Sequence, residues 1–188
     1  MKISVLLPYK ENFSPEYAGA VSIFLKNTVV KSKYKKNITI YGHTKFKKKL
    51  LNNYKNINFT NFFLRSKSKI YVKKFLENEK INKSILIEIH NRPEYVKLIY
   101  KQNKNIVLYF HNNPLEMKLS KSLKERIDLI NKTKKIIFNS KWTLNKFKFG
   151  LPRKYYTKKL EVIYPSTTKK MINFKNKKKI IIFVGKLN

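Results

Sequence analysis

The sequence contains no cysteine, only four glycines in 188 residues, and a single aspartate, Asp128. Without cysteine the chain forms no disulfide and offers no thiolate to a metal, which suits a protein of the reducing cytoplasm. With one aspartate and no G-x-S-x-G segment, the sequence does not fit a Ser-His-Asp hydrolase. No short-spaced cluster of histidine, cysteine and carboxylate has zinc-site spacing, so we expect no bound metal.

Long hydrophobic runs are missing as well. After Met1 and Lys2 only Ile3 to Leu7 precede Pro8, which is too short for the apolar region of a signal peptide. No apolar run approaches the roughly 20 residues that span a bilayer. We therefore expect a cytoplasmic protein, at most peripheral on the inner face of the cytoplasmic membrane.

Acidic residues are few: ten stand against 44 basic residues, for a formal net charge of +34. All but four of the basic residues are lysine, and asparagine, isoleucine, phenylalanine and tyrosine are abundant too. These residues have A/T-rich codons, so the composition indicates an AT-biased genome more than selection for base recognition, which favours arginine. The charge should still attract the protein to anionic membrane surfaces and let it bind nucleic acid weakly and non-specifically.

What the sequence does contain is an alternation of two kinds of segment. Helical spacing marks residues 21–29, 72–76 and 119–130. Short runs rich in β-branched and aromatic residues lie around them, at Lys2–Leu7, Ile38–Tyr41, Ile57–Phe63, Ile85–His90, Ile106–His111 and Lys135–Phe138. Because these runs are continuously apolar, the strands should be buried on both faces. The pattern predicts an α/β fold with a Rossmann-like, doubly wound parallel sheet.

The end of the chain predicts a second domain. Residues 1–164 have the length of one domain, and residues 165–179 are polar and lysine-rich like a linker. Residues 180–188, IIIFVGKLN, then resemble a buried strand that meets a turn. We interpret this strand as the first of a C-terminal domain that the chain does not otherwise contain.

Polar residues follow the predicted strands, where ligands bind in such sheets. His90 and His111 end two consecutive strands, and each could contact a ligand or serve as a hydrogen-bonded structural residue. Ser14, Asn113 and Ser140 have the character of helix N-caps. His43 follows Gly42 in an expected surface turn and receives no role.

The segments SPEYAGA (14–20), HNRPEY (90–95), YFHNNPLEM (109–117), FNSKWTLNKF (138–147), VIYPS (162–166) and FVGKLN (183–188) occur in an order that resembles family 4 glycosyltransferases of the GT-B architecture. HNRPEY together with YFHNNPLEM is especially similar to bacterial enzymes that build lipopolysaccharide and capsule. The resemblance covers the N-terminal, acceptor-binding domain and the opening of the C-terminal domain.

The resemblance implies retaining transfer of a sugar from a nucleotide-sugar donor to a surface-glycan or lipid-linked acceptor, without a metal or other cofactor. It places His111 beside the transferred sugar, and Ala18, Gly19 and Ala20 beside the donor diphosphate, where the family usually has paired glycines. Lys186, after Gly185, stands where the family usually has a diphosphate-binding arginine. The residues implied on the acceptor side are Glu16, His90, Asn91, Arg92 and Asn112.

The family's paired donor-binding glutamates lie in the C-terminal domain, so we expect this chain to be inactive alone. Basic, aromatic segments at residues 45–51 and 141–149 are candidates for contact with anionic lipid, or are ordinary basic helices with one buried face. Two other hypotheses stay open: a basic α/β nucleic-acid-binding protein, which the net charge favours, and a non-catalytic remnant of the enzyme.

Overall fold

The computed structural model describes residues 1–59 and 66–165. These residues form one sheet of seven parallel strands in the order β3-β2-β1-β4-β5-β6-β7. The strands are β1 (Ile3–Leu6), β2 (Ile38–Gly42), β3 (Tyr54–Asn56), β4 (Leu86–His90), β5 (Ile106–Phe110), β6 (Lys135–Phe138) and β7 (Leu160–Val162). The helices are α1 (Ala20–Lys31), α2 (Lys67–Asn82), α3 (Pro93–Ile99), α4 (Leu123–Lys132) and α5 (Lys141–Lys148). The predicted fold class is confirmed.

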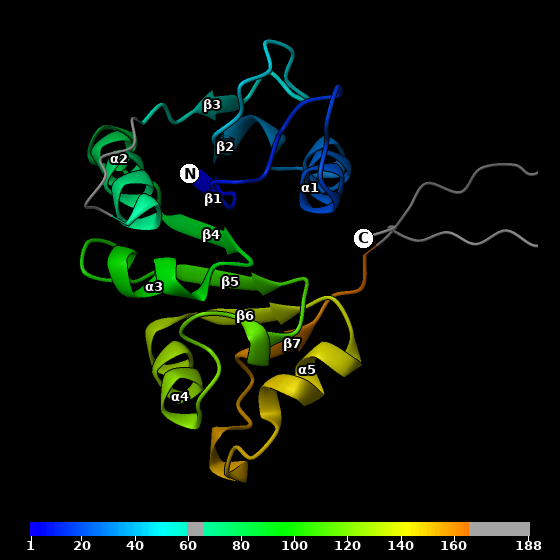
Figure 1. The fold of residues 1–188 in the computed structure, drawn as a ribbon, viewed down its shortest axis with the longest axis vertical. Helices are drawn as coiled ribbons and strands as arrows, with labels where there is room; N and C mark the ends of the chain where they lie inside the picture. Colours follow the sequence, from blue (N-terminus) through cyan, green and yellow to red (C-terminus); the bar gives the residue numbers. More distant parts are fainter. Residues whose placement is uncertain (60–65, 166–188) are drawn as a thin grey trace, which may run out of the picture.

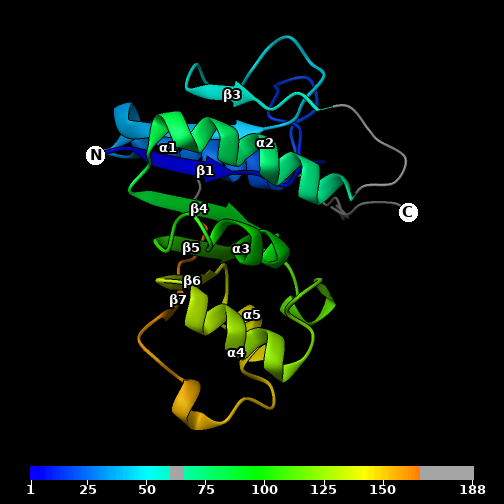
Figure 2. The ribbon, with the colours of Figure 1, turned by 90° about the vertical axis from the view of Figure 1, so that its left-hand side faces the viewer.

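Helices cover both faces of the sheet. Figure 1 shows α2, α3 and α4 on one side and α1 on the other, and Figure 2 shows the strands side by side behind α2 and α3. Two buried clusters match these sides. One joins Tyr71 and Phe75 of α2 to Leu108 and other strand residues, and the second joins Val21 and Leu25 of α1 to strand residues of the opposite face. Burial on both faces explains why the central strands are continuously apolar.

The two edge strands depart from the sequence-based expectation. The third strand is Tyr54–Asn56, whereas residues 57–59 of the predicted strand Ile57–Phe63 are not in a strand, although Ile57 is buried; residues 60–63 lie outside the described residues. β7 has no counterpart among the predicted strands. Both are three-residue strands at opposite edges of the sheet with one or two apolar residues each, so they have no apolar run to reveal them. The predicted linker (165–179) and final strand (180–188) lie outside the described residues, Pro165 excepted.

The order of the strands sets the place where a ligand can enter. The chain runs outward from β1 through β2 to β3, and then returns to the other side of β1 with β4. The loops that follow β1 and β4 therefore leave the sheet in opposite directions, and the carboxyl ends of these two strands are where a ligand-binding crevice is expected in such a sheet. Within the two described ranges, no helix is long and apolar enough to cross a membrane.

A buried polar cluster lies at the amino-terminal end of the strands, opposite the carboxyl ends. The Glu79 carboxylate at the end of α2 accepts hydrogen bonds from Ser4 Oγ at 2.5 Å and from the backbone N–H of Ser84 at 3.2 Å. Ser4 and Ser84 also lie within hydrogen-bond distance of each other, at 2.7 Å. The cluster joins β1, α2 and the start of β4, and lies at the wrong end of the strands for ligand binding.

Candidate functional site

Two histidines and a glutamate form a hydrogen-bonded row at the ends of β4 and β5. His90 is the last residue of β4, and His111 directly follows β5, its parallel neighbour. Nδ1 of His90 lies 2.8 Å from Nε2 of His111, and Nε2 of His90 lies 2.6 Å from Oε1 of Glu88. Parallel pairing of the two strands therefore joins residues that are 21 positions apart in the sequence.

Two asparagines hold the backbone of His111 from either side. The side-chain oxygen of Asn91 accepts a hydrogen bond from the His111 N–H at 2.8 Å, and the side-chain amide of Asn139 donates to the His111 carbonyl at 2.8 Å. Asn91 adopts a left-handed conformation (φ 50°), which asparagine tolerates better than most residues. The ends of β4, β5 and β6 are thus tied together at His111.

Aromatic rings enclose the imidazole of His111. Phe24 of α1 lies edge-on at 5.0 Å between ring centroids, and Tyr109 stacks against the imidazole at 4.4 Å. This burial, and secondarily the neighbouring His90, lowers the pKa of His111 to about 3, so the ring is neutral at pH 7. Burial and the nearby Glu88 raise the pKa of Tyr109 to about 12, and its hydroxyl donates to the carbonyl of Ile163 at 2.7 Å.

The small-residue loop before α1 surrounds a carboxylate. Gly19 is the N-cap of α1, and a Cβ at this position would clash with Oε1 of Glu11. The same oxygen accepts a hydrogen bond from the backbone N–H of Ser22 in the first turn, at 3.0 Å. Gly19 has an ordinary negative φ (−79°), so a larger residue would conflict with the Glu11 carboxylate and not with the backbone conformation. Ala18 precedes Gly19 in this loop, and Ala20 is the first residue of α1.

The other residues that the resemblance implied are dispersed around the carboxyl-terminal end of the strands. Glu16 and Asn112 are exposed, while Arg92 is half-buried at the start of α3 and donates from Nη1 to the Asn91 carbonyl at 2.8 Å. The side chain of Asn91 is already engaged by the His111 backbone. Gly185 and Lys186 lie outside the described residues.

The three residues with N-cap character behave differently. The side chains of Asn113 and Ser140 cap a short 3-10 turn (Pro114–Glu116) and α5, by accepting from the N–H groups of Leu115 and Thr143. Ser14 is buried in the loop after β1 and accepts from the N–H of Glu16 at 3.2 Å, so it makes a local turn and caps no helix.

An aromatic pocket of about 740 Å³ opens beyond β1 and β2, and sequence reasoning missed it. Its lining includes the stacked pair Tyr17 and Phe46, with centroids 6.4 Å apart, and the mutually contacting rings of Tyr9, Phe59 and His43. Four of its nine lining residues are tyrosine or phenylalanine, against 14% aromatic residues in the whole chain. Three further lining residues are lysines, Lys10, Lys45 and Lys67, so the pocket combines aromatic rings with positive charge.

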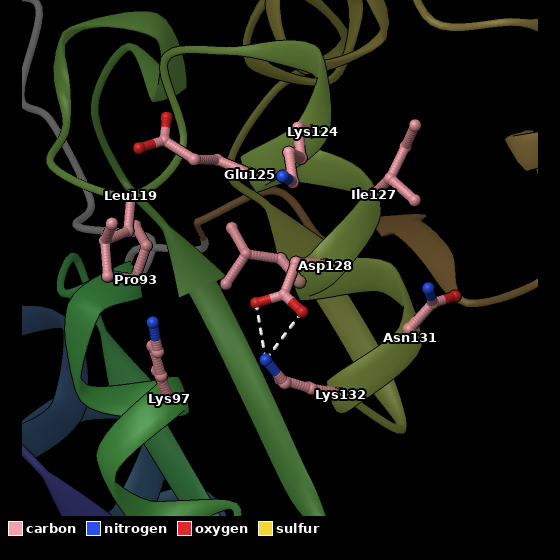
Figure 3. A pocket seen from close by; sticks show the side chains of 10 residues that line it. Pro93, Lys97, Leu119, Lys124, Glu125, Ile127, Asp128, Asn131 and Lys132 are labelled. Carbon is pink, nitrogen blue, oxygen red and sulfur yellow. Dashed lines mark hydrogen bonds and ion pairs between the residues drawn. The ribbon is translucent and has the colours of Figure 1, made fainter.

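A second hollow, of about 410 Å³, lies between α3 and α4 (Figure 3). Lys97 of α3 lies on one side, and Lys132 on the other is paired with Asp128 at 2.6 Å. α3 and α4 cover the face of the sheet opposite α1, so this groove is separated by the sheet from the imidazole of His111 beside Phe24. It contains no strand-end polar residue and is a groove between helices.

Metal binding finds no support in residues 1–59 and 66–165, where no three histidine or acidic side chains come together as a possible metal site. A donor set could have been built from His90, His111 and Glu88, but their nitrogens and oxygen point at one another instead of a common point.

Comparisons with known proteins address the fold. No protein-family model and no curated protein matches the sequence. Among solved structures, the crystal structure of HepE from Anabaena in complex with UDP matches with a TM-score of 0.56 and 18% sequence identity, over 89% of this chain and 44% of HepE. The chain thus spans less than half the length of that protein. At this identity the match concerns the fold: the chain has the α/β architecture of one part of a UDP-binding protein.

Proposed function

We propose that this chain is the acceptor-side half of a glycosyltransferase of GT-B architecture, related to family 4, which transfers a sugar from a nucleotide-sugar donor with retention of configuration. The observation that carries the proposal is the partly buried, neutral His111, fixed at the carboxyl end of β5. The similarity in fold to a structure that holds UDP supports a nucleotide-sugar as the donor. His111 would contact the transferred sugar.

The donor diphosphate needs partners that this half supplies poorly. The first turn of α1 offers N–H groups, but the Glu11 carboxylate occupies the N–H of Ser22. A diphosphate next to Gly19, Ala18 and Ala20 would meet this negative charge, unless Glu11 moves away. We therefore assign most of the donor affinity to a C-terminal domain that begins with the segment around Gly185 and Lys186. Residues 1–188 alone should transfer no sugar.

The aromatic pocket is suited to the acceptor. Aromatic rings stack against the apolar faces of sugar rings, and the Tyr17–Phe46 pair and Tyr9 offer such surfaces at the carboxyl ends of β1 and β2. Glu16, Arg92 and Asn112 are polar residues of the same edge that can bind sugar hydroxyls; His90 and Asn91 support His111 from behind. We propose a surface glycan or a lipid-linked saccharide as the acceptor class.

A lipid-linked acceptor places the protein near a membrane. On α5 and directly after it, Trp142 and Phe149 are 56% and 71% exposed among lysines. Exposed aromatic residues within a basic segment favour the interface of an anionic bilayer. We propose that this segment touches the inner face of the cytoplasmic membrane.

A titration followed by two-dimensional NMR tests the proposed sugar contact. Because a chain of charge +34 attracts any phosphate, UDP-glucose and UDP-N-acetylglucosamine are each compared with UDP at the same ionic strength. Because most of the donor affinity is assigned to the C-terminal domain, the titration is carried to high ligand concentration, where we expect the imidazole and backbone signals of His111 to shift with a UDP-sugar and not with UDP. His111→Ala should abolish the sugar-specific shifts, while the matched variant His43→Ala should keep them. Equal shifts with UDP and UDP-sugars would contradict the assignment.

The nucleic-acid alternative rests on net charge alone. It predicts tight binding with a strand or sequence preference, whereas charge by itself gives weak binding that salt removes.

A further inference from the structure

The row of Glu88, His90 and His111 allows the direction of its hydrogen bonds to be worked out. An ionised carboxylate has no proton to donate, so Nε2 of His90 must carry the hydrogen in its 2.6 Å bond with Glu88. A neutral imidazole has one N–H, which leaves Nδ1 of His90 as an acceptor. The 2.8 Å bond between the rings then requires Nε2 of His111 to be the donor.

The opposite direction needs an extra proton. If Nε2 of His111 were the acceptor, His90 would carry hydrogens on both nitrogens, and its ring is completely buried. That imidazolium would be paired with Glu88, but it would still place a charge on a fully buried ring, whereas the neutral row satisfies both hydrogen bonds with one proton fewer.

The second nitrogen of His111, Nδ1, has no hydrogen-bond partner among the described residues. Across residues 1–59 and 66–165, no hydrogen bond involves Nδ1 of His111, and this atom is not one of the buried polar atoms without a partner. Since the residue is also only partly buried, Nδ1 keeps access to solvent in the part of the chain that the structure describes. As the donor hydrogen sits on Nε2, Nδ1 presents a lone pair.

We propose that Glu88 and His90 are positioning residues, which hold His111 in its Nε2–H tautomer so that Nδ1 acts as a hydrogen-bond acceptor toward the crevice. A group that binds there must donate a hydrogen bond. If the proposed function is correct, on which this last step rests, the group is a hydroxyl of the transferred sugar and not a phosphate oxygen, which only accepts. Glu88 thereby selects the class of atom that His111 contacts without touching the ligand.

The tautomer can be measured without any ligand. In the 188-residue chain labelled with ¹⁵N-histidine, long-range ¹H–¹⁵N correlation spectra distinguish a protonated ring nitrogen from an unprotonated one. At pH 7.5 we expect His111 to show a protonated Nε2 and an unprotonated Nδ1. A protonated Nδ1 with an unprotonated Nε2 would overturn the proposal.

Substitution then tests the role of the carboxylate. Glu88→Leu removes the acceptor of His90, so the row can run in either direction, and we expect the His111 nitrogens to shift toward the values of a tautomer mixture. Glu161→Leu is the matched control, because Glu161 lies in β7 of the same sheet, is paired with Lys135 at 2.6 Å and makes no hydrogen bond to either histidine. It should leave the tautomer unchanged. An unchanged tautomer in folded Glu88→Leu would also overturn the proposal.

Two readouts keep the proposal separate from the proposed function. If Glu88→Leu does not fold, the wild-type tautomer still decides whether the row runs as proposed. If the tautomer is the expected one but UDP-sugars cause no sugar-specific shift at His111, the role of Glu88 stands and the sugar assignment fails.

Discussion

Mild acid should destabilise this fold through His111. The pKa of His111 is lowered from 6.5 to about 3 in the folded chain, first by burial and then by His90. The unfolded chain therefore binds a proton at this residue more readily than the folded chain does. The contribution to stability is complete above pH 6.5, and it is lost as the pH falls from 6.5 toward 3.

The size of the effect follows from this shift. One pKa unit corresponds to about 1.36 kcal/mol. At pH 5, about 1.5 units below the ordinary pKa, His111 should lower the free energy of unfolding by about 2 kcal/mol relative to pH 7.5. That is a large part of the 5–15 kcal/mol that typically stabilises a domain, so about this much should be easy to detect.

The assay is urea unfolding at pH 7.5, 6 and 5, at constant ionic strength, followed by circular dichroism. A chain with a net charge of +34 gains further positive charge in acid, which destabilises it by itself. The comparison is therefore with His111→Asn, which shares this general effect and lacks the imidazole. His43→Asn is the matched control, since it removes a histidine and keeps His111.

We expect the wild type and His43→Asn to lose about 2 kcal/mol more than His111→Asn between pH 7.5 and pH 5. Equal losses in all three proteins would refute the reasoning, because the imidazole would then take up its proton as easily in the folded chain as in the unfolded one.

Two further predictions concern packing away from His111. Gly19→Ala should lower the free energy of unfolding by about 1 kcal/mol, because the new Cβ displaces the Glu11 carboxylate from α1. In a Glu11→Ala background the same substitution should be neutral or stabilising. Thermal unfolding of the two single variants and the double variant measures this, and additive effects would argue against the contact. Glu79→Leu should lower the free energy of unfolding, measured with urea, by about 2–3 kcal/mol, because Ser4 and Ser84 lose their carboxylate acceptor. The UDP-sugar shifts at His111 should stay as in the wild type. A change below about 0.5 kcal/mol, the size of an ordinary surface effect, would contradict the prediction.

The strands that are buried on both faces of the sheet could be predicted from the sequence, and the edge strands could not. β1, β4, β5 and β6 are central strands with continuous apolar runs, and the sequence placed each of them within a residue or two. β3 and β7 lie at the edges, where one or two buried side chains suffice, and neither left a clear pattern.

The candidate site was only partly accessible to the same reasoning. Polar residues at strand ends pointed to His90 and His111, but Glu88 lies inside an apolar run and gave no sign of a role. Nor could spacing show that Asn91 and Asn139 hold the backbone of His111, because the three residues meet only through parallel pairing of β4, β5 and β6.

The sequence by itself determined the fold class and showed that polar groups gather at the carboxyl-terminal ends of the strands. Both follow from periodicity and turn residues, which are local properties of the chain. The tertiary structure decided which of those groups touch. It joined Glu88 to His90 and His90 to His111, placed Glu11 against Gly19, and gathered Tyr9, Tyr17, Phe46 and Phe59 around one pocket. Hydrogen-bond direction and pKa depend on distances of a few ångströms between distant residues, and only the packed sheet sets those distances.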